Sequence, residues 1–278
     1  MNRKQRSALA AVRKFITENP LLSAVAAACI LVILIIVLAV SCTRKGPEPD
    51  AVLFEEDAWK TNENGFLYYD KDGYTSQFGI DISEWVEKID FRQIRSSGVE
   101  FVILRAGYRG YETGKFVLDN QLASYLEAAS AAGLKVGAYF VSQAVNEQEA
   151  IEEADFILDH VNGYRLDMPV YIDLESVYDT ARTDHLTASE YTKIADAFCR
   201  RVEERGYQGG IYANSDWFRN RLNFQEIRQY DIWLAQYSSS LSTDLPVNMW
   251  QYTNEGLIDG CEMWVDLNVR VTQEEPAS

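Results

Sequence analysis

Two carboxylic acids, Asp173 and Glu175, stand two positions apart in residues 168–176. The apolar run before them is short and rich in β-branched and aromatic residues, which predicts a strand that begins at Pro169. Residues two apart on a strand face the same side, about 6.6 Å apart, so both carboxyl groups would lie at the strand's carboxyl end. Because neighbouring carboxylates resist ionising together, one should keep its proton near neutral pH. Such a pair suits cleavage of a glycosidic bond; the alternative is two solvated carboxylates that end a strand.

The elements that would position this pair alternate between strand and helix, and strands alone follow towards the end of the chain. The expected strands are residues 78–82, 100–106, 134–141, 170–174, 209–213, 231–235, 248–252 and 265–268. The expected helices are residues 91–97, 119–132, 146–161 and 187–205, two of which begin with cap pairs, Asn146 with Glu149 and Thr187 with Glu190. This order predicts an α/β fold, a TIM-like irregular barrel whose carboxyl end carries the chemistry.

An apolar segment precedes the barrel. Residues 21–40 are twenty residues without a charge, enough to cross a bilayer of about 30 Å as a helix. Five basic residues stand before this segment and only two, Arg44 and Lys45, just after it. The positive-inside rule therefore predicts a cytoplasmic tail at 1–20, a transmembrane signal anchor at 21–42, and a single-pass protein of the cell membrane with an extracellular catalytic domain. The alternatives are a cleaved signal peptide and lipoprotein processing at Cys42.

Residues 43–75 begin with a polar, proline-containing stretch and continue into a turn, a short strand and a turn between Trp59 and Tyr74. The second part resembles one unit of the aromatic hairpin repeats of cell-wall-binding proteins. A single unit cannot form a stacked array, so we expect a linker or stalk with a short aromatic hairpin. The catalytic barrel would then span 76–273, followed by a tail at 274–278.

Charge and cysteine content exclude several classes of function. After residue 50 the chain has 19 basic and 39 acidic residues, a net charge of −20, which argues against nucleic-acid binding. The four cysteines have neither a metal-site spacing nor a disulfide framework, although Cys199 and Cys261 are able to pair or to stay free. The two histidines, His160 and His185, fit a metal or Ser–His–Asp mechanism poorly. We therefore expect no metal and no other cofactor.

Seven short segments, in order along the chain, resemble the muramidases of glycoside hydrolase family 25. They are residues 79–85 (GIDISEW) followed by 89–91 (IDF), 137–140 (GAYF), 173–175 (DLE), 210–212 (GIY), 232–235 (IWLA), 250–253 (WQYT) and 265–268 (VDLN). The resemblance implies a barrel of eight strands and about five helices. It also implies hydrolysis of the β-1,4 bond between N-acetylmuramic acid and N-acetylglucosamine, with peptidoglycan glycan strands as the partner; we expect a monomer.

The resemblance also implies the residues of the site. The catalytic set would be four acids, with Glu175 as the proton donor: Glu175, Asp173, Asp81 and Asp266. The substrate-binding set would be Arg105, Tyr139, Tyr212, Trp233, Tyr237 and Gln251. Many members carry Lys-Ala-Thr-Glu-Gly where this chain has RAGYRG at 105–110, so a cation is kept at Arg105 and Tyr108 replaces the glutamate.

Alternatives remain open for several of these residues. Asp81 would otherwise be a turn or cap residue, and Tyr139 and Trp233 ordinary core residues. If Arg105 faces inward, it requires partners, and the catalytic carboxylates are its natural ones. Asp173 would assist the substrate's 2-acetamido group; the rival mechanism is inversion by a water activated by Asp81 or Asp266. A catalytically silent glycan-binding or wall-assembly module is a second functional hypothesis, against which the four acids argue.

Overall fold

The computed structural model describes residues 51–177, 180–241 and 243–274. The tail and signal anchor predicted for 1–42, the first residues of the linker, and residues 275–278 lie outside these ranges. Across the described ranges, no helix is long and apolar enough to span a bilayer.

Eight strands close into a barrel, because β3 pairs with β4 on one side and with β11 on the other. The strands are β3 (Tyr74–Ile82), β4 (Phe101–Arg109), β6 (Lys135–Val141), β7 (Val170–Asp173), β8 (Gly209–Asn214), β9 (Asp231–Ala235), β10 (Met249–Gly256) and β11 (Val265–Gln273). Neighbours from β3 through β10 run parallel, whereas β11 is antiparallel to both β10 and β3. The predicted barrel and its irregular closing side are thus confirmed.

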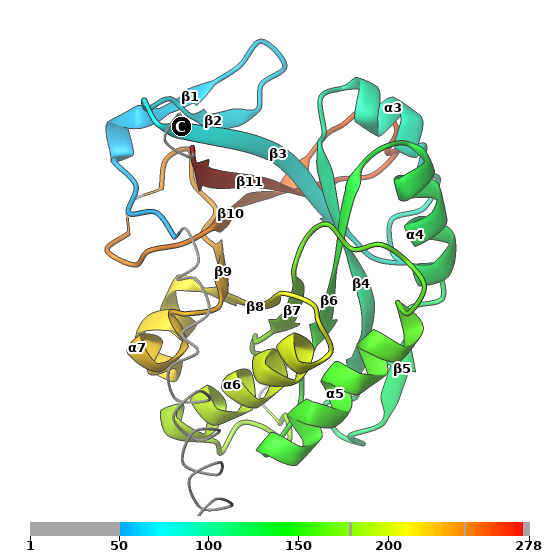
Figure 1. Ribbon diagram of the computed structural model, residues 1–278, viewed down its shortest axis with the longest axis vertical. Coiled ribbons are helices and arrows are strands. Elements are labelled where there is room, and N and C mark those ends of the chain that lie inside the picture. The colour runs from blue at the N-terminus through cyan, green and yellow to red at the C-terminus, as the bar shows by residue number, and fades with distance from the viewer. Residues whose placement is uncertain (1–50, 178–179, 242, 275–278) are drawn as a thin grey trace, which may run out of the picture. The chain divides into compact units, whose positions relative to one another are not determined.

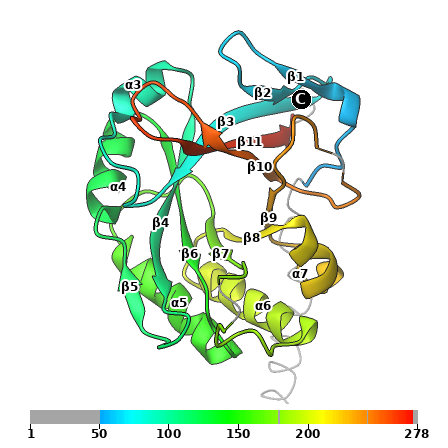
Figure 2. The same cartoon turned by 180° about the vertical axis from the view of Figure 1, so that it is seen from behind.

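Helices cover the outside of the barrel, mainly beside β4 to β8, as Figures 1 and 2 show from opposite sides. Besides short 3-10 and π turns at 56–58 and 217–221, five helices lie within the described ranges: α3 (Phe91–Ser96), α4 (Leu122–Ala131), α5 (Glu147–His160), α6 (Ala188–Glu204) and α7 (Phe224–Ile227). Both predicted cap pairs are present, since Asn146 accepts a hydrogen bond from the Glu149 backbone N–H and Thr187 forms a reciprocal capping box with Glu190. Local cap chemistry therefore sets these helix starts.

The barrel interior is a separate, mostly aromatic cluster. It contains Phe101, Ile103, Met168, Tyr171, Trp233 and Met249, with Tyr139 and Tyr212 packed against it. Gly79 makes room for this packing, because a Cβ on it would lie 2.2 Å from the Phe101 ring. The interior is a filled core, so the chemistry must occur at an end of the barrel.

The aromatic hairpin forms, but it is not a stalk. β1 (Trp59–Thr61) and β2 (Leu67–Tyr69) pair in antiparallel fashion. Phe66 stacks on Phe78 of β3 with ring centroids 3.7 Å apart, and Trp59 meets Trp250 of β10 at 4.8 Å. Residues 51–75 therefore belong to the same compact unit as the barrel. The free energy gained by burying these rings exceeds the conformational entropy that a flexible linker would keep.

A further strand, β5 (Phe116–Leu118), escaped the sequence-based prediction. It pairs antiparallel with the extended end of β4 and forms the edge of the sheet. Phe116 stacks on Phe156 of α5 with ring centroids 4.7 Å apart. Only three residues long and largely exposed, β5 has too little alternation to be recognised from its sequence.

Candidate active site

Acidic side chains meet where the barrel closes. Asp81 of β3 and Asp266 of β11 are direct cross-strand partners near the carboxyl end of β3. Asp173 is the last residue of β7 at the same end of the barrel, and Glu175 lies two residues farther on, in the loop rather than on the strand. Asp81 and Asp173 are buried, Asp266 is half-buried and Glu175 is exposed. The carboxyl ends of β3 and β7 and the start of the antiparallel β11 thus bring the four predicted acids to one end of the barrel.

Two amides hold Asp81 in place. Its Oδ1 accepts hydrogen bonds from Gln251 Nε2 and Asn268 Nδ2, both at 2.8 Å. Gln251 and Asn268 are themselves cross-strand partners on β10 and β11. The Gln251 carbonyl accepts from the Tyr212 and Tyr237 hydroxyls at 2.8 and 3.2 Å, and the Asn268 carbonyl accepts from Trp233 Nε1 at 2.8 Å. These donors fix the amides so that their N–H groups face Asp81.

Asp173 has no such support. Its Oδ1 is buried and has no hydrogen-bond partner among the residues that the structure describes. On neighbouring strands it is paired with Val141 and Tyr212, so the sheet holds its backbone while Oδ1 is left without a donor. A buried carboxylate oxygen without a donor is costly, and a ligand that supplied an N–H or O–H would remove this cost.

The four acids hold protons more tightly than free carboxyl groups. Burial, then the charges of Glu175 and Asp81, raise the pKa of Asp173 well above its usual value. Burial and the charges of Asp81 and Glu175 raise the pKa of Asp266 to about 8. Although the Glu175 side chain keeps contact with solvent, the protein around its carboxyl group removes part of its hydration and raises its pKa. The pKa of Asp81 is raised less, to about 6, because hydrogen bonds from its two amide donors partly offset the effect of burial. The set therefore carries protons at neutral pH, as acid catalysis requires.

Arg105 does not pair with these four acids, contrary to our expectation. It is buried, and its Nε donates to Asp119 Oδ2 at 3.0 Å while Nη2 donates to Glu84 Oε1 at 3.3 Å. Asn120 Nδ2 donates to the other oxygen of Glu84 at 2.8 Å. The β3–α3 loop, which carries Glu84, is thereby fastened to β4, and Arg105 acts on the site through its charge, which opposes the rise in the Asp173 pKa.

The predicted aromatic residues separate into two groups. Trp233 is 1% exposed and contacts Tyr139, Tyr171 and Tyr212 with ring centroids 4.6–6.0 Å away. It packs as the floor beneath the carboxylates and is too buried to line a sugar groove. Tyr139 and Tyr212 are half-buried above it, and Tyr237 is exposed. Of the predicted aromatic residues, only these last three tyrosines retain surface that a substrate can contact.

A second buried ion pair, missed by the sequence reasoning, braces the strand ends beside Asp173. Arg109 Nε donates to Glu153 Oε1 at 2.8 Å, and Ser142 Oγ donates to Glu153 Oε2 at 2.6 Å. Ser142 N in turn donates to the Asp173 carbonyl at 3.0 Å. Burial raises the pKa of Glu153 to about 7. No local sequence signal joins these residues, because Arg109 and Glu153 are 44 positions apart.

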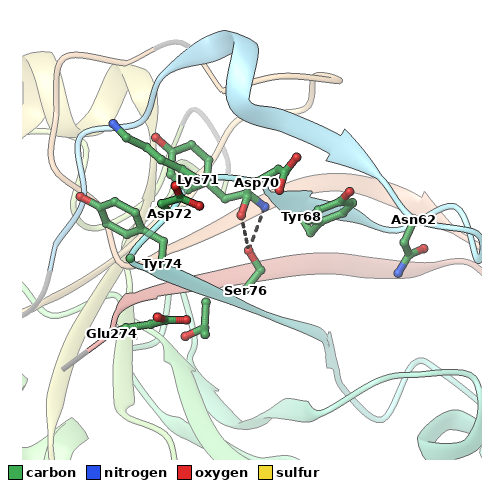
Figure 3. A pocket seen from close by; sticks show the side chains of 11 residues that line it. Asn62, Tyr68, Asp70, Lys71, Asp72, Tyr74, Ser76 and Glu274 are labelled. Atoms are coloured by element: carbon green, nitrogen blue, oxygen red, sulfur yellow. Dashed lines mark hydrogen bonds between the residues drawn. The ribbon is translucent and has the colours of Figure 1, made fainter. Parts of the chain in front are cut away.

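Other side chains with metal or thiol chemistry stay apart from the site. Cys199 and Cys261 are both free thiols, so they do not pair with each other. In the described part of the chain, no group of three or more His, Cys, Asp or Glu residues is arranged to hold a metal ion. A hollow of about 610 Å³ between β2, the start of β3 and Glu274 contains none of the predicted site residues (Figure 3). Its β3 residues begin at Tyr74, seven positions before Asp81 and about 23 Å away along the strand, at the opposite end of the barrel.

Comparison with known proteins now decides the family. Residues 80–261 match the model of glycosyl hydrolases family 25. The chain belongs to this family. The autolytic lysozyme of Clostridium acetobutylicum is 26% identical over 191 residues, which are 68% of this chain and 54% of that protein. Lysozyme M1 of Streptomyces globisporus is 24% identical over 200 residues, 68% of this chain and 66% of that protein. The chain thus spans about half the length of the first of these family 25 relatives.

Solved structures share the fold of this chain. The modular autolysin LytC from Streptococcus pneumoniae, solved in complex with a synthetic peptidoglycan ligand, aligns with a TM-score of 0.62 and 23% identity over 79% of this chain and 57% of that chain. A bacterial lysozyme from Streptomyces coelicolor aligns with a TM-score of 0.61 and 22% identity over 70% and 91% of the two chains. These similarities support the barrel described above.

Proposed function

We propose that this chain is a muramidase that cleaves the β-1,4 bond between N-acetylmuramic acid and N-acetylglucosamine in peptidoglycan. The observation that carries the proposal is the convergence of Asp81, Asp173, Glu175 and Asp266, with raised pKa values, at the carboxyl end of a family 25 barrel. The names of the relatives, lysozyme and autolysin, agree with this reaction.

Glu175 is the general acid in this proposal. Its side chain is exposed just beyond the end of β7, where the oxygen of a bound glycan can reach it, and its pKa is raised. Its proton passes to the glycosidic oxygen as the bond to the anomeric carbon breaks. The resulting carboxylate then takes a proton from the water that attacks that carbon, which restores the acid.

Asp173 orients the nucleophile. Its unpartnered Oδ1 accepts the N–H of the substrate's 2-acetamido group, whose carbonyl oxygen attacks the anomeric carbon as the leaving group departs. The bond from this oxygen breaks when water adds. Two displacements at one carbon retain the anomeric configuration, unlike direct attack by a water activated by Asp81 or Asp266.

The anomer of the first product separates these two mechanisms. Acetamido-assisted cleavage gives the β configuration at the new reducing end, whereas a single attack by water gives the α configuration. Proton NMR during the first minutes of a fast digestion distinguishes the two before the anomers equilibrate. An initial α-anomer would transfer the role of nucleophile from the acetamido group to a water held by Asp81 or Asp266.

Substrate binding also affects which of the two acids, Asp173 or Glu175, carries a proton. In the free site, burial and the charges of Glu175 and Asp81 raise the pKa of Asp173 well above its usual value. A hydrogen bond from the acetamido N–H favours the ionised form of Asp173, and this new charge in turn raises the proton affinity of Glu175. The acid thus carries its proton when a substrate with an acetamido group is in place.

We also propose that the barrel is held outside the cell by a single-pass anchor in the cell membrane. The proposal rests on the uncharged residues 21–40 and on the excess of basic residues before them. Protease added to cells stripped of their wall should release the barrel. A barrel protected until the membrane is permeabilised would contradict this orientation.

The activity is tested with the full-length chain and purified peptidoglycan. After digestion, new reducing ends are reduced with borohydride and the sugars are hydrolysed and identified. The proposal expects reduced muramic acid. Reduced glucosamine would assign the cut to the other glycosidic bond, and no new reducing ends would favour a silent glycan-binding module.

A further inference from the structure

Large apolar side chains are exposed in an uneven pattern. Eight of them in the described ranges are substantially exposed: Leu53, Trp85, Phe116, Leu118, Tyr237, Leu257, Met263 and Trp264. Five of the eight lie in loops at the catalytic ends of four consecutive strands of the barrel, β3, β11, β10 and β9. These five, which we name the apolar rim, are Trp85, Tyr237, Leu257, Met263 and Trp264.

The six tryptophans show the same uneven exposure. Four of the six are buried, namely Trp59, Trp217, Trp233 and Trp250. The other two, Trp85 and Trp264, are 69% and 62% exposed, and both belong to the rim. Trp85 follows Asp81 by four positions and Trp264 precedes Asp266 by two, so each indole belongs to a loop that begins or ends near a carboxylate of the site.

The loops that carry the two indoles are fastened together. Ile89 and Cys261 form an isolated antiparallel bridge, and Asp90 N donates to the Gly260 carbonyl at 2.8 Å. Lys88 pairs with Glu262 across the same two loops. The connection between β10 and β11 accordingly lies beside α3 in both views (Figures 1 and 2). The hydrogen bond from Arg105 to Glu84 also ties the first loop to β4, so the two loops that carry the indoles are held in place without a ligand.

We propose that the apolar rim is a second binding region for the glycan strand, which extends contact beyond the sugars at the scissile bond. The inference rests on the proposed function and adds to it a preference for long strands. Sugar rings present apolar C–H faces without charge, which suit exposed indoles on a chain with a net charge of −16. The position of the rim beside Asp81 and Asp266 identifies the ligand, because a glycan strand that extends from these carboxylates on the β3–β11 side must pass these loops.

The test uses the full-length chain with Glu175→Gln and β-1,4-linked N-acetylglucosamine oligomers of two and six sugars, which share the acetamido groups and linkage of the substrate. Trp85→Ala and Trp264→Ala should each weaken binding of the hexamer by about tenfold and change dimer binding by less than about twofold. The hexamer should also protect tryptophan fluorescence of the Glu175→Gln chain from acrylamide quenching. Leu53→Ala, at an exposed apolar residue outside the rim, is the matched control and should change neither affinity.

Outcomes for the rim and for the activity are separable. If Trp85→Ala and Trp264→Ala weaken dimer and hexamer binding equally, or weaken neither, the rim is not a second binding region. This holds even where the parent chain hydrolyses peptidoglycan. Length-dependent binding that needs Trp85 and Trp264, without any hydrolysis by the parent chain, would overturn the activity and leave the rim. A third outcome is protection from quenching that increases with protein concentration and does not depend on added hexamer. That result would assign the rim to contact with a second copy of the chain and contradict the proposal.

Discussion

Asp266 of β11 lies directly opposite Asp81 of β3 in the antiparallel pair that closes the barrel. Like charges in opposed positions destabilise a sheet, and here both residues also lose hydration. The protein limits this cost by holding a proton on Asp266, whose pKa is raised to about 8, while two amide donors support Asp81. The pair thus links the closure of the barrel to the charge of the site.

The first prediction concerns this pair and pH. The unfolded Asp266 releases its proton near pH 3.8 and the native one near 8, so between these values the native state binds more protons. Stability from this group is therefore fully present below about pH 3.8 and is lost as the pH rises towards 8. Asp266→Asn should raise the free energy of unfolding at pH 8 by on the order of 2–4 kcal/mol and change it little at pH 4.

Urea unfolding at both pH values measures this difference. Asp167→Asn, at a residue that pairs with the largely exposed Arg165, provides the control and should show no such dependence on pH. Equal effects of Asp266→Asn at pH 4 and pH 8 would refute the assignment of a bound proton to Asp266.

The second prediction concerns Arg105. Arg105→Ala leaves Asp119 buried beside Glu84 without a cation, which should lower the free energy of unfolding by about 3–5 kcal/mol. Arg165→Ala breaks a surface pair with Asp167 and should leave stability nearly unchanged. Thermal and urea unfolding compare the two variants. An Arg105→Ala protein as stable as the parent would show that Asp119 and Glu84 do not need the cation.

The strands, caps and catalytic end of the barrel are predictable because their signals are local. Alternating strand and helix segments give the order of elements, and Thr187 with Glu190 marks the start of α6 within four residues. Strand ends then place Asp81 and Asp173 at one end of the barrel, since the carboxyl ends of parallel strands meet there. Asp266 reaches the same end from the start of β11, which is antiparallel. The resemblance supplies roles for these residues that spacing alone leaves open.

The errors concern partners that are distant in sequence. Gln251 and Asp81 are 170 positions apart, so their hydrogen bond has no local signal. Arg105 is buried as expected, yet its carboxylate partners are not the expected ones, because Asp119 reads in the sequence as the start of a helix. Trp233 was expected in the groove, but three tyrosines cover it. Side-chain pattern predicts which residues are buried and does not tell which neighbours bury them.

A third prediction concerns the amides that hold Asp81. Asn268→Ala removes a hydrogen bond to Asp81 Oδ1 that lowers its pKa, so the pKa of Asp81 should rise above about 6. Carbon-13 NMR titration of labelled aspartate measures this shift directly. Gln208→Ala, which removes a donor to Asp231 at the other end of the barrel, should leave the Asp81 titration unchanged. An unaltered Asp81 titration in Asn268→Ala would contradict the role given to this amide.

Asp173→Asn provides a fourth prediction, since it replaces an acceptor-only carboxylate with a group that cannot stabilise the positive charge on the acetamido group. Turnover should fall by roughly 10²–10⁴, with glycan binding retained, because the lost interaction acts in the transition state. Binding is measured separately by equilibrium titration with short oligomers. A comparable loss of affinity and of turnover would show that Asp173 serves binding only.

The fifth prediction carries the central claim, that Glu175 donates the proton that breaks the glycosidic bond. Glu175→Gln keeps the shape of the side chain and removes the transferable proton. The matched control is Glu204→Gln, the same change at a largely exposed glutamate that pairs with Arg201 at the end of α6. Circular dichroism and thermal unfolding should show that both variants fold like the parent, because both changes lie at exposed positions.

The measurement that tests this claim most directly is the rate of reducing-end release from purified peptidoglycan by Glu175→Gln, Glu204→Gln and the parent chain. The rate should fall by roughly 10²–10⁴ or more in Glu175→Gln and stay near the parent value in Glu204→Gln. A Glu175→Gln chain that releases reducing ends within about threefold of the parent rate would contradict the role of Glu175 as the general acid.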